Sequence, residues 1–207
     1  MNLDNFGAPI SIKSGVSSNQ IREVVELFDE AFAAKFSSAI PEPSLRKEFW
    51  SQVIIPAQVT VAERGGEILG LALTSFPERP GFSKDASSKL FQVLGISGGF
   101  RAAFIFMLFS KLDWKPEPRT CYLEALCVSS KARGLGLGTH MLESLSSIAK
   151  SEGLGRITLK VTLENSAARK LYLRLGFVIT NTSRYRLLKL FTGTEGADTM
   201  TLALTSE

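Results

Sequence analysis

Three glycines at alternate positions stand where the chain passes from a strand-like stretch to a helix-like one. The run is Arg133-Gly-Leu-Gly-Leu-Gly-Thr139, between the apolar residues 121–128 and the amphipathic residues 137–150. Because glycine has no Cβ, a ligand can approach its N–H group closely, and the first N–H groups of a helix have no partner within the helix. The helix dipole and the cation of Arg133 both favour an anion here. The run therefore predicts a phosphate or pyrophosphate site.

The spacing of these glycines separates the classes of phosphate site. A Walker loop needs Lys-Ser/Thr after its last glycine, but Gly138 is followed by Thr139-His140. A dinucleotide-binding loop of the form Gly-x-Gly-x-x-Gly needs a third glycine where Thr139 stands. The pattern that fits is Arg/Gln-x-x-Gly-x-Gly/Ala, met by Arg133, Gly136 and Gly138.

A second motif begins 27 residues after Gly138, which leaves room for one helix and one strand. It reads Asn165-Ser-Ala-Ala-Arg-Lys-Leu-Tyr172-Leu-Arg-Leu-Gly176-Phe177. Asn165 or Ser166 can cap a helix and Gly176 can end it in a left-handed conformation. The apolar residues that share one face are Ala167, Ala168, Leu171, Tyr172 and Leu175. Taken alone, this is also the pattern of an ordinary amphipathic helix with a core tyrosine.

Together the two motifs resemble those of the GNAT superfamily of N-acetyltransferases, over residues 121–178. The first is similar to the acetyl-CoA signature of that family, and the second to its Asn-x-x-Ala-x-x-Leu-Tyr-x-x-x-Gly-Phe. The resemblance implies an α/β (α+β) fold with a mixed central sheet flanked by helices, here as a single domain over residues 1–207. It implies acetyl transfer from acetyl-CoA to a small-molecule or peptide amine by direct attack. A non-catalytic acyl-CoA-binding or sensor module on the same fold is the alternative.

The resemblance also implies a set of cofactor-binding residues. In the family, a backbone N–H stabilises the oxyanion where the fourth strand separates from the fifth, which corresponds here to the neighbourhood of Val128. Residues 126–130 would run beside the pantetheine arm. The predicted cofactor-binding residues are Leu126, Cys127, Val128, Arg133, Gly134, Leu135, Gly136, Leu137, Gly138, Thr139, Asn165, Ala168 and Tyr172.

Two side chains are candidates for proton transfer. Tyr172 occupies the tyrosine of the second motif, whose hydroxyl points at the CoA sulfur in the family, and an ordinary phenol is protonated at neutral pH. A tyrosine packed in the core is the other interpretation. Glu124 is the candidate base, since a carboxylate within an apolar strand must face solvent, a cation or the substrate cleft. Strand alternation puts it on the face of Leu126 and Val128 unless a bulge changes the register. A structural salt bridge is the alternative role for Glu124.

His140, the only histidine, would lie in the first turn of the helix after the glycine run. It is predicted to face solvent or to contact a CoA phosphate. With no second histidine to pair with it, no metal site is expected.

Residues 77–118 read as an irregular hydrophobic insertion between two strands. Its aromatic residues, concentrated in 91–114, are Phe91, Phe100, Phe104, Phe106, Phe109 and Trp114. The interpretations left open are a helix that helps to form an apolar acceptor cleft, a homodimer interface, an in-plane membrane contact and a buried core helix. The uncharged run 102–109 has eight residues, fewer than the ~20 that a bilayer requires. No transmembrane segment is therefore expected.

The remaining elements that must position this chemistry follow from periodicity and turn residues. They are a strand at 10–13, helices at 19–35 and 45–54, strands at 58–62 and 68–75 joined by a hairpin turn over 64–67, a strand at 121–128, a helix at 137–151, a strand at 156–162, a helix at 166–175, and strands near 177–190 and at 197–204.

Composition and charge limit the classes of binding partner and the cellular location that we expect. Residues 1–100 carry 9 Lys/Arg against 11 Asp/Glu, a balance of −2, and residues 101–207 carry 15 against 9, a balance of +6. The predicted phosphate site lies in the basic half, as an anionic cofactor would favour. No basic cluster is interleaved with aromatic residues, so a nucleic-acid partner is not expected. Cys121 and Cys127 would share a strand face about 20 Å apart, too far for a disulfide. Without a signal-peptide pattern at the N-terminus, a cytoplasmic location is expected.

Overall fold

A single mixed sheet of seven strands forms the centre of the molecule. The computed structural model describes residues 9–110, 117–184, 189 and 193–204. The strands are β1 (Ser11–Ser14), β2 (Val59–Arg64), β3 (Glu67–Ser75), β4 (Thr120–Val128), β5 (Arg156–Thr162), β6 (Val178–Arg184) and β7 (Gly196–Ala203). Their order is β1-β2-β3-β4-β5-β7-β6, with β4 and β5 parallel and every other neighbouring pair antiparallel. The predicted α/β class with a mixed sheet is confirmed.

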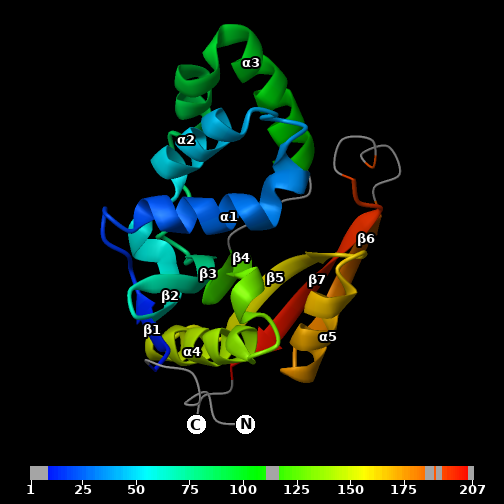
Figure 1. Cartoon of the computed structure of the whole chain (residues 1–207). Helices are drawn as coiled ribbons and strands as arrows, with labels where there is room; N and C mark the ends of the chain where they lie inside the picture. The colour runs from blue at the N-terminus through cyan, green and yellow to red at the C-terminus, as the bar shows by residue number, and fades with distance from the viewer. Residues whose placement is uncertain (1–8, 111–116, 185–188, 190–192, 205–207) are drawn as a thin grey trace.

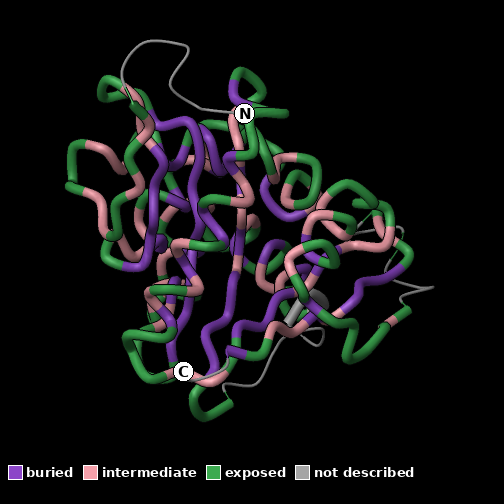
Figure 2. The backbone as a smooth tube through the Cα atoms, turned by 90° about the horizontal axis from the view of Figure 1, so that it is seen from below, coloured by how far each residue is buried: buried purple, intermediate pink, exposed green. Residues whose placement is uncertain are grey.

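Helices cover both faces of this sheet (Figure 1). In the described part of the chain, the α-helices are α1 (Ile21–Phe36), α2 (Pro43–Val53), α3 (Ala86–Ser110), α4 (Leu137–Ser151) and α5 (Ser166–Arg174), with short 3₁₀ helices η2 (Pro56–Gln58) and η3 (Ser130–Ala132). One buried cluster joins α1, α2 and α3 to the sheet, and a second joins α4 and α5 to its other face. Figure 2 shows long buried stretches of the chain in purple, and the burial pattern of β3 is of this kind.

The predicted hairpin turn and the predicted ends of α5 are confirmed. Gly65 (φ 57°) and Gly66 (φ 88°) both adopt the positive φ that a tight hairpin turn needs. Asn165 caps α5, since its Oδ1 accepts a hydrogen bond from the Ala168 N–H at 3.1 Å. Gly176 ends that helix with φ 88°. On α5 only Ala167 departs from the expected apolar face, because it is exposed.

The prediction of an irregular segment at 77–118 is wrong, because most of it is the helix α3. The helix is bent at Gly95 (φ 67°, ψ −177°), a conformation that favours glycine. Its two arms approach closely beyond the bend. A Cβ at Gly99 would lie 2.4 Å from Cδ1 of Phe91, and the rings of Phe91 and Phe100 are 5.1 Å apart. Trp114, the side chain of Phe109, and the part of the predicted strand 177–190 beyond Arg184 lie outside the described residues.

Over Ala86–Met107, α3 is also long and apolar enough to cross a membrane, the one such helix in the described part of the chain. The uncharged run 102–109 only partly overlaps this apolar stretch. Its eight residues are therefore not enough to decide whether α3 could span a bilayer. In the structure α3 is bent, carries Lys89 and Arg101, and buries Leu90, Ala102 and Ile105 in the cluster shared with α1 and α2. Core helices of domains also reach this length and composition, so the two properties do not assign α3 to a membrane.

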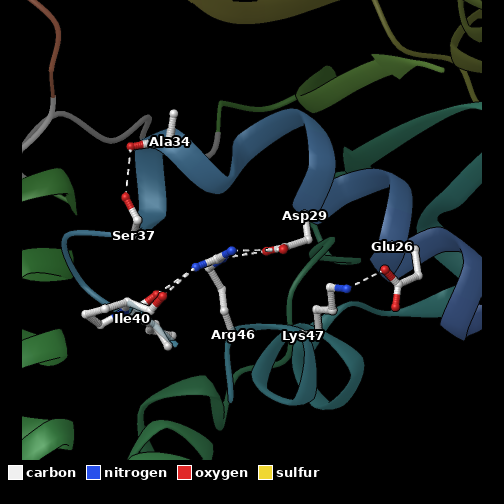
Figure 3. Close-up of polar contacts among 8 residues, drawn as sticks. Glu26, Asp29, Ala34, Ser37, Ile40, Arg46 and Lys47 are labelled. Atoms are coloured by element: carbon white, nitrogen blue, oxygen red, sulfur yellow. Dashed lines mark hydrogen bonds and ion pairs between the residues drawn. The ribbon is translucent and has the colours of Figure 1, made fainter. Parts of the chain in front are cut away.

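A buried ion pair fixes α1 against α2 (Figure 3). Nε and Nη2 of Arg46 donate to the two carboxylate oxygens of Asp29 at 2.5 and 2.9 Å. The remaining guanidinium nitrogen donates to the backbone oxygens of Ile40 at 2.9 Å and Pro41 at 3.3 Å. Both charged side chains are almost completely buried, and such charges are tolerated only when they are paired and hydrogen-bonded. The pair therefore sets the spacing of two helices that form a wall of the cavity described below.

Candidate active site

The glycine run forms a turn whose backbone donors face outward at the start of α4. Gly134 (φ 81°) and Gly136 (φ 75°) are left-handed, and α4 begins directly after Gly136. The N–H groups of residues 133–138 donate no hydrogen bond to any residue that the structure describes. Residues 133–136 are exposed. This is the geometry of an anion cradle, since several backbone donors lie together at the positive end of a helix dipole.

The two sequence motifs meet at this helix end. A Cβ at Gly138 would lie 3.2 Å from Cδ2 of Leu171 and 4.0 Å from Cγ2 of Val128. The start of α4, the middle of α5 and the end of β4 therefore converge at Gly138. His140 is exposed as predicted, with Nδ1 at 3.0 Å from the Gly136 oxygen.

β4 and β5 separate beside this point. They pair only from Thr120↔Arg156 to Leu123↔Leu159, although β4 continues against β3 as far as Val128 and β5 continues against β7 as far as Thr162. The separation of the two strands that the family resemblance implied is confirmed. From Glu124 onward, the edge of β4 that faces β5 has no strand partner among the described residues, which leaves backbone groups for a ligand.

A bulge in β4 places Glu124 on the face of α1, α2 and α3. Leu73 pairs with Ala125 whereas Thr74 pairs with Leu123, so Glu124 is the extra residue. Such an insertion reverses the alternation of side chains. Glu124 therefore faces away from Leu126 and Val128, which pack on the α4 side. Simple alternation does not hold here, and the bulge considered as the alternative is present.

The same bulge separates the two cysteines. Cys121 belongs to the cluster on the α4 side and Cys127 to the cluster on the α1 side, so the expectation of one shared face is also wrong. Both thiols are free and buried.

A cavity of about 650 Å³ opens on the face that Glu124 shares with α1, α2 and α3. The residues that line it are Phe28, Phe32, Lys35, Phe36, Phe49, Trp50, Val53, Phe82, Ala86, Ser87, Leu90, Ala103, Phe106, Met107, Tyr122, Glu124 and Ala125. Most of these side chains are apolar, and six come from α3. The N-terminal helices and the insertion thus surround one cavity beside β4.

The carboxylate of Glu124 is held at the floor of this cavity by a short chain of hydrogen bonds. The Ser75 hydroxyl donates to Oε1 of Glu124 at 2.7 Å, and the Gly81 N–H donates to Oγ of Ser75 at 2.8 Å. Glu124 itself is half-buried. Sequence reasoning missed Ser75 and the aromatic residues of α2, because only the pairing of β3 with β4 and the packing of three helices bring them to Glu124.

Tyr172 lies on the opposite face of the sheet, in the cluster of α4 and α5. Its side chain is 7% exposed and its ring centroid is 5.5 Å from that of Phe177. The hydroxyl makes no hydrogen bond with any residue in the described part of the chain. Burial, with a smaller contribution from Cys127, raises the pKa of Tyr172 to about 12. The phenol therefore keeps its proton through the neutral and mildly alkaline range.

The thiols of Cys121 and Cys127 keep their protons for the same reason. Burial raises the pKa of each to about 12, with smaller contributions from Glu124 and Glu30 respectively. The thiolate is the nucleophilic form of cysteine, so neither residue is suited to carry an acyl group.

The buried thiols predict a loss of stability at alkaline pH. Unfolded thiols release protons near a pKa of 9.0, whereas the folded ones retain them to about 12. Above pH 9 the unfolded state binds fewer protons, so the free energy of unfolding should fall by up to about 1.4 kcal/mol per pH unit for each thiol. Denaturant titrations from neutral to alkaline pH measure this slope. Cys121→Ala should remove the contribution of one thiol from this slope. An unchanged slope would contradict the raised pKa of Cys121.

Comparison with known proteins agrees with this geometry. A family model described as "Acetyltransferase (GNAT) family" matches residues 21–177, which is about three quarters of the chain. The chain belongs to the GNAT acetyltransferase family. The match includes β4, the glycine run, α4 and α5. Among the described residues, no group of three or more His, Cys, Asp or Glu side chains could hold a metal ion.

Two curated relatives match part of this GNAT domain. The chain is 31% identical over 81 residues to "GCN5-related N-acetyltransferase 6, chloroplastic" of Arabidopsis thaliana, which covers 39% of this chain and 28% of that protein. It is 37% identical over 65 residues to "Uncharacterized N-acetyltransferase YobR" of Bacillus subtilis, which covers 31% of this chain and 26% of that protein. The matches span just over a quarter of the length of each relative.

Solved structures share the fold over almost the whole chain. A GCN5-related N-acetyltransferase from Kribbella flavida superimposes with a TM-score of 0.62 at 21% identity, covering 94% of this chain and 98% of its own. The yncA protein of Salmonella typhimurium, a putative acetyltransferase solved with acetyl-CoA, gives a TM-score of 0.59 at 20% identity and covers 96% and 95% of the two chains. At these identities the likeness shows the fold.

Proposed function

We propose that this GNAT protein is an N-acetyltransferase that transfers an acetyl group from acetyl-CoA to an amine acceptor by direct attack. One observation carries the proposal. The outward-facing N–H groups of residues 133–138 and the cavity that contains Glu124 lie on opposite sides of the sheet, and both adjoin the opening between β4 and β5. A donor and an acceptor bound at these two places would meet at that opening.

The residues present on the α4 side suit acetyl-CoA. Gly134, Gly136 and the free N–H groups around them offer donors for a pyrophosphate at the start of α4, with Arg133 as an exposed cation beside them. The unpaired edge of residues 126–128 offers backbone partners to the pantetheine amides. Leu135, Leu137, Thr139, Asn165 and Ala168 complete the proposed contact set around the same helix end. Asn165 acts there through its cap of α5.

Three groups of the protein would divide the work of the transfer. Glu124 accepts the proton that the attacking amine loses as its nitrogen forms a bond to the acetyl carbon. Backbone N–H groups on the free edge of β4 near Val128 stabilise the developing oxyanion. Tyr172 donates its proton to the sulfur when the carbon–sulfur bond breaks. The raised pKa of Tyr172, about 12, keeps that proton available.

The proposal is tested by mixing the purified protein with acetyl-CoA and a panel of amines and measuring thiol release together with the acetylated product. Acetyl-CoA binding without transfer to any amine would favour the non-catalytic binding or sensor module instead.

Glu124→Gln is expected to lower kcat/KM for the acceptor by about 100-fold at neutral pH, because it removes a general base and keeps the side-chain size. Acetyl-CoA affinity, measured by calorimetry, should remain the same. The rate of the variant should rise more steeply with pH than that of the parent, since it depends on amine already deprotonated in solution. Glu152→Gln, at an exposed carboxylate paired with Arg79 at the far end of α4, is the control. Equal activity of Glu124→Gln and the parent would leave Glu124 a structural role only.

A further inference from the structure

We propose that the acceptor is a primary amine on an uncharged aromatic body, an arylalkylamine. The inference rests on the proposed function and adds the chemical class of the acceptor. Its basis is the wall of the cavity beside Glu124. Of the seventeen lining residues that the structure describes, eight are aromatic, namely Phe28, Phe32, Phe36, Phe49, Trp50, Phe82, Phe106 and Tyr122.

These rings hold one another in place. Trp50 contacts Phe28 at 5.1 Å and Phe36 at 4.8 Å between centroids, while Phe106 contacts Phe36 at 6.0 Å and Phe49 at 5.9 Å. The rings belong to α1, α2 and α3, and the buried Asp29–Arg46 pair joins the first two helices. Interlocked rings on fixed helices form a preorganised apolar surface, which favours a ligand that offers a flat apolar face in return.

The lining has few polar groups, and the charges among them narrow the class of acceptor amine that would fit. Among the lining residues that the structure describes, Glu124 is the only carboxylate and Lys35 the only cation, with hydroxyl groups on Ser87 and Tyr122. One ammonium group can be placed at Glu124, but a second would find no other carboxylate among the described lining residues and would meet Lys35. Sugar hydroxyls and peptide groups would lose their hydrogen bonds to water with few replacements. Polyamines, aminosugars and extended peptides are therefore poor matches for this cavity.

Size and direction agree with the same class. A volume of about 650 Å³ falls within the range of about 300–1,000 Å³ typical of small-molecule sites, so a short alkylamine would leave most of it unfilled. Glu124 lies where β4 and β5 cease to pair. An amine drawn to Glu124 would stand at the opening while its aromatic body occupies the space between the helices.

The first test measures kcat/KM of the protein for a panel of acceptor amines at saturating acetyl-CoA. The panel is tryptamine, 2-phenylethylamine, ethylamine, spermidine and a tetrapeptide with a free N-terminus. Because each buried methylene changes affinity by about fourfold, the two arylalkylamines should exceed ethylamine in kcat/KM by about 100-fold or more. Spermidine and the tetrapeptide should fall well below them. A preference for either of these two would overturn the acceptor class and leave the acetyltransferase proposal intact.

The second test uses two phenylalanines of α3 as a matched pair. Phe106 lines the cavity and is half-buried, whereas Phe104 is 54% exposed and is not part of the lining. Phe106→Ala should raise KM for tryptamine by about 10-fold or more, with an unchanged dissociation constant for acetyl-CoA, and Phe104→Ala should change neither. Ala103→Phe fills the cavity from the same helix and should also raise KM for tryptamine, in case Phe106→Ala folds poorly. Equal effects of Phe106→Ala and Phe104→Ala, or a shift of both to a smaller sedimenting species with unaltered kinetics, would overturn the inference in favour of a dimer seam.

Calorimetry separates failure of the acceptor class from failure of the reaction. Tryptamine should bind to the protein saturated with CoA, and Phe106→Ala should weaken that binding. If tryptamine binds in this way and no amine is acetylated, the cavity assignment stands and the proposed reaction is wrong. If amines are acetylated and tryptamine does not bind, the acceptor class is wrong.

Discussion

Replacing Gly136 with aspartate is expected to weaken CoA binding by about 100-fold or more. The reason is electrostatic, because a carboxylate would stand at the start of α4 among the free N–H groups proposed to hold the pyrophosphate. Like charges brought together at a binding surface cost several kcal/mol, and each ~1.4 kcal/mol is a factor of ten in affinity. A Cβ at this position would meet only His140, at 3.6 Å or more, so crowding contributes little. Calorimetric titration of CoA into the variant measures the effect.

The chain offers a close control for this change. Gly153, just past the other end of α4, has φ 71° and open space around its missing Cβ, compared with φ 75° at Gly136. Gly153→Asp therefore imposes the same kind of backbone strain and the same added charge, away from the glycine run. It should lose at least as much thermal stability, because the helix dipole opposes a carboxylate at this end of α4, and it should bind CoA normally. Unchanged CoA affinity in a folded Gly136→Asp protein would remove residues 133–139 from the proposed cofactor site.

Two parts of the candidate site could be predicted from the sequence because their signals are local. Gly134 and Gly136 adopt left-handed conformations that few other residues adopt, so alternating glycines predict a turn at this point. The start of α4 lies directly after that turn. The cap at Asn165 and the left-handed Gly176 likewise fix the ends of α5 from within one short segment. The separation of β4 from β5 was implied by the family resemblance and is not visible in either strand alone.

The side of the sheet that Glu124 faces could not be predicted, because the cause lies in another strand. The bulge exists in the pairing of Leu73 and Thr74 with β4, and nothing in residues 120–128 marks an extra residue. Simple alternation then assigns the wrong face to Glu124 and the same face to both cysteines.

A helix was among the interpretations of the insertion, but the extent of α3 was not predicted, and the reason is different. It is apolar around most of its circumference and contains Gly95, Gly98 and Gly99, which disfavour a helix by propensity. Packing of its buried residues on α2 and the bend at Gly95 override that preference. The cavity that α3 completes depends on side chains from residue 28 to residue 125, so no local pattern could reveal it.

Tyr172→Phe is expected to lower kcat by about 100-fold or more while acetyl-CoA binds almost as before. The change removes one hydroxyl that has no partner among the described residues, and it keeps the ring that packs on Phe177. If that hydroxyl supplies the proton to the leaving thiolate, its loss should appear in the chemical step, where general acid catalysis typically contributes about 10²–10⁴-fold. Rapid-mixing measurement of acetyl transfer, together with calorimetry of acetyl-CoA, separates the two quantities.

The pH dependence and a second tyrosine sharpen this test. With a pKa of about 12, Tyr172 is protonated across the pH range in which acetyl transfer would be assayed, so the parent should show no alkaline decline caused by this group. Tyr122→Phe is the matched comparison, because it removes the same hydroxyl on the opposite face of the sheet, where Tyr122 lines the cavity proposed for the acceptor. Its effect should fall on the acceptor KM, whereas that of Tyr172→Phe should fall on kcat. Equal kcat in Tyr172→Phe and the parent, with acetyl transfer shown to limit turnover, would leave Tyr172 as a core residue that only packs between α5 and the sheet.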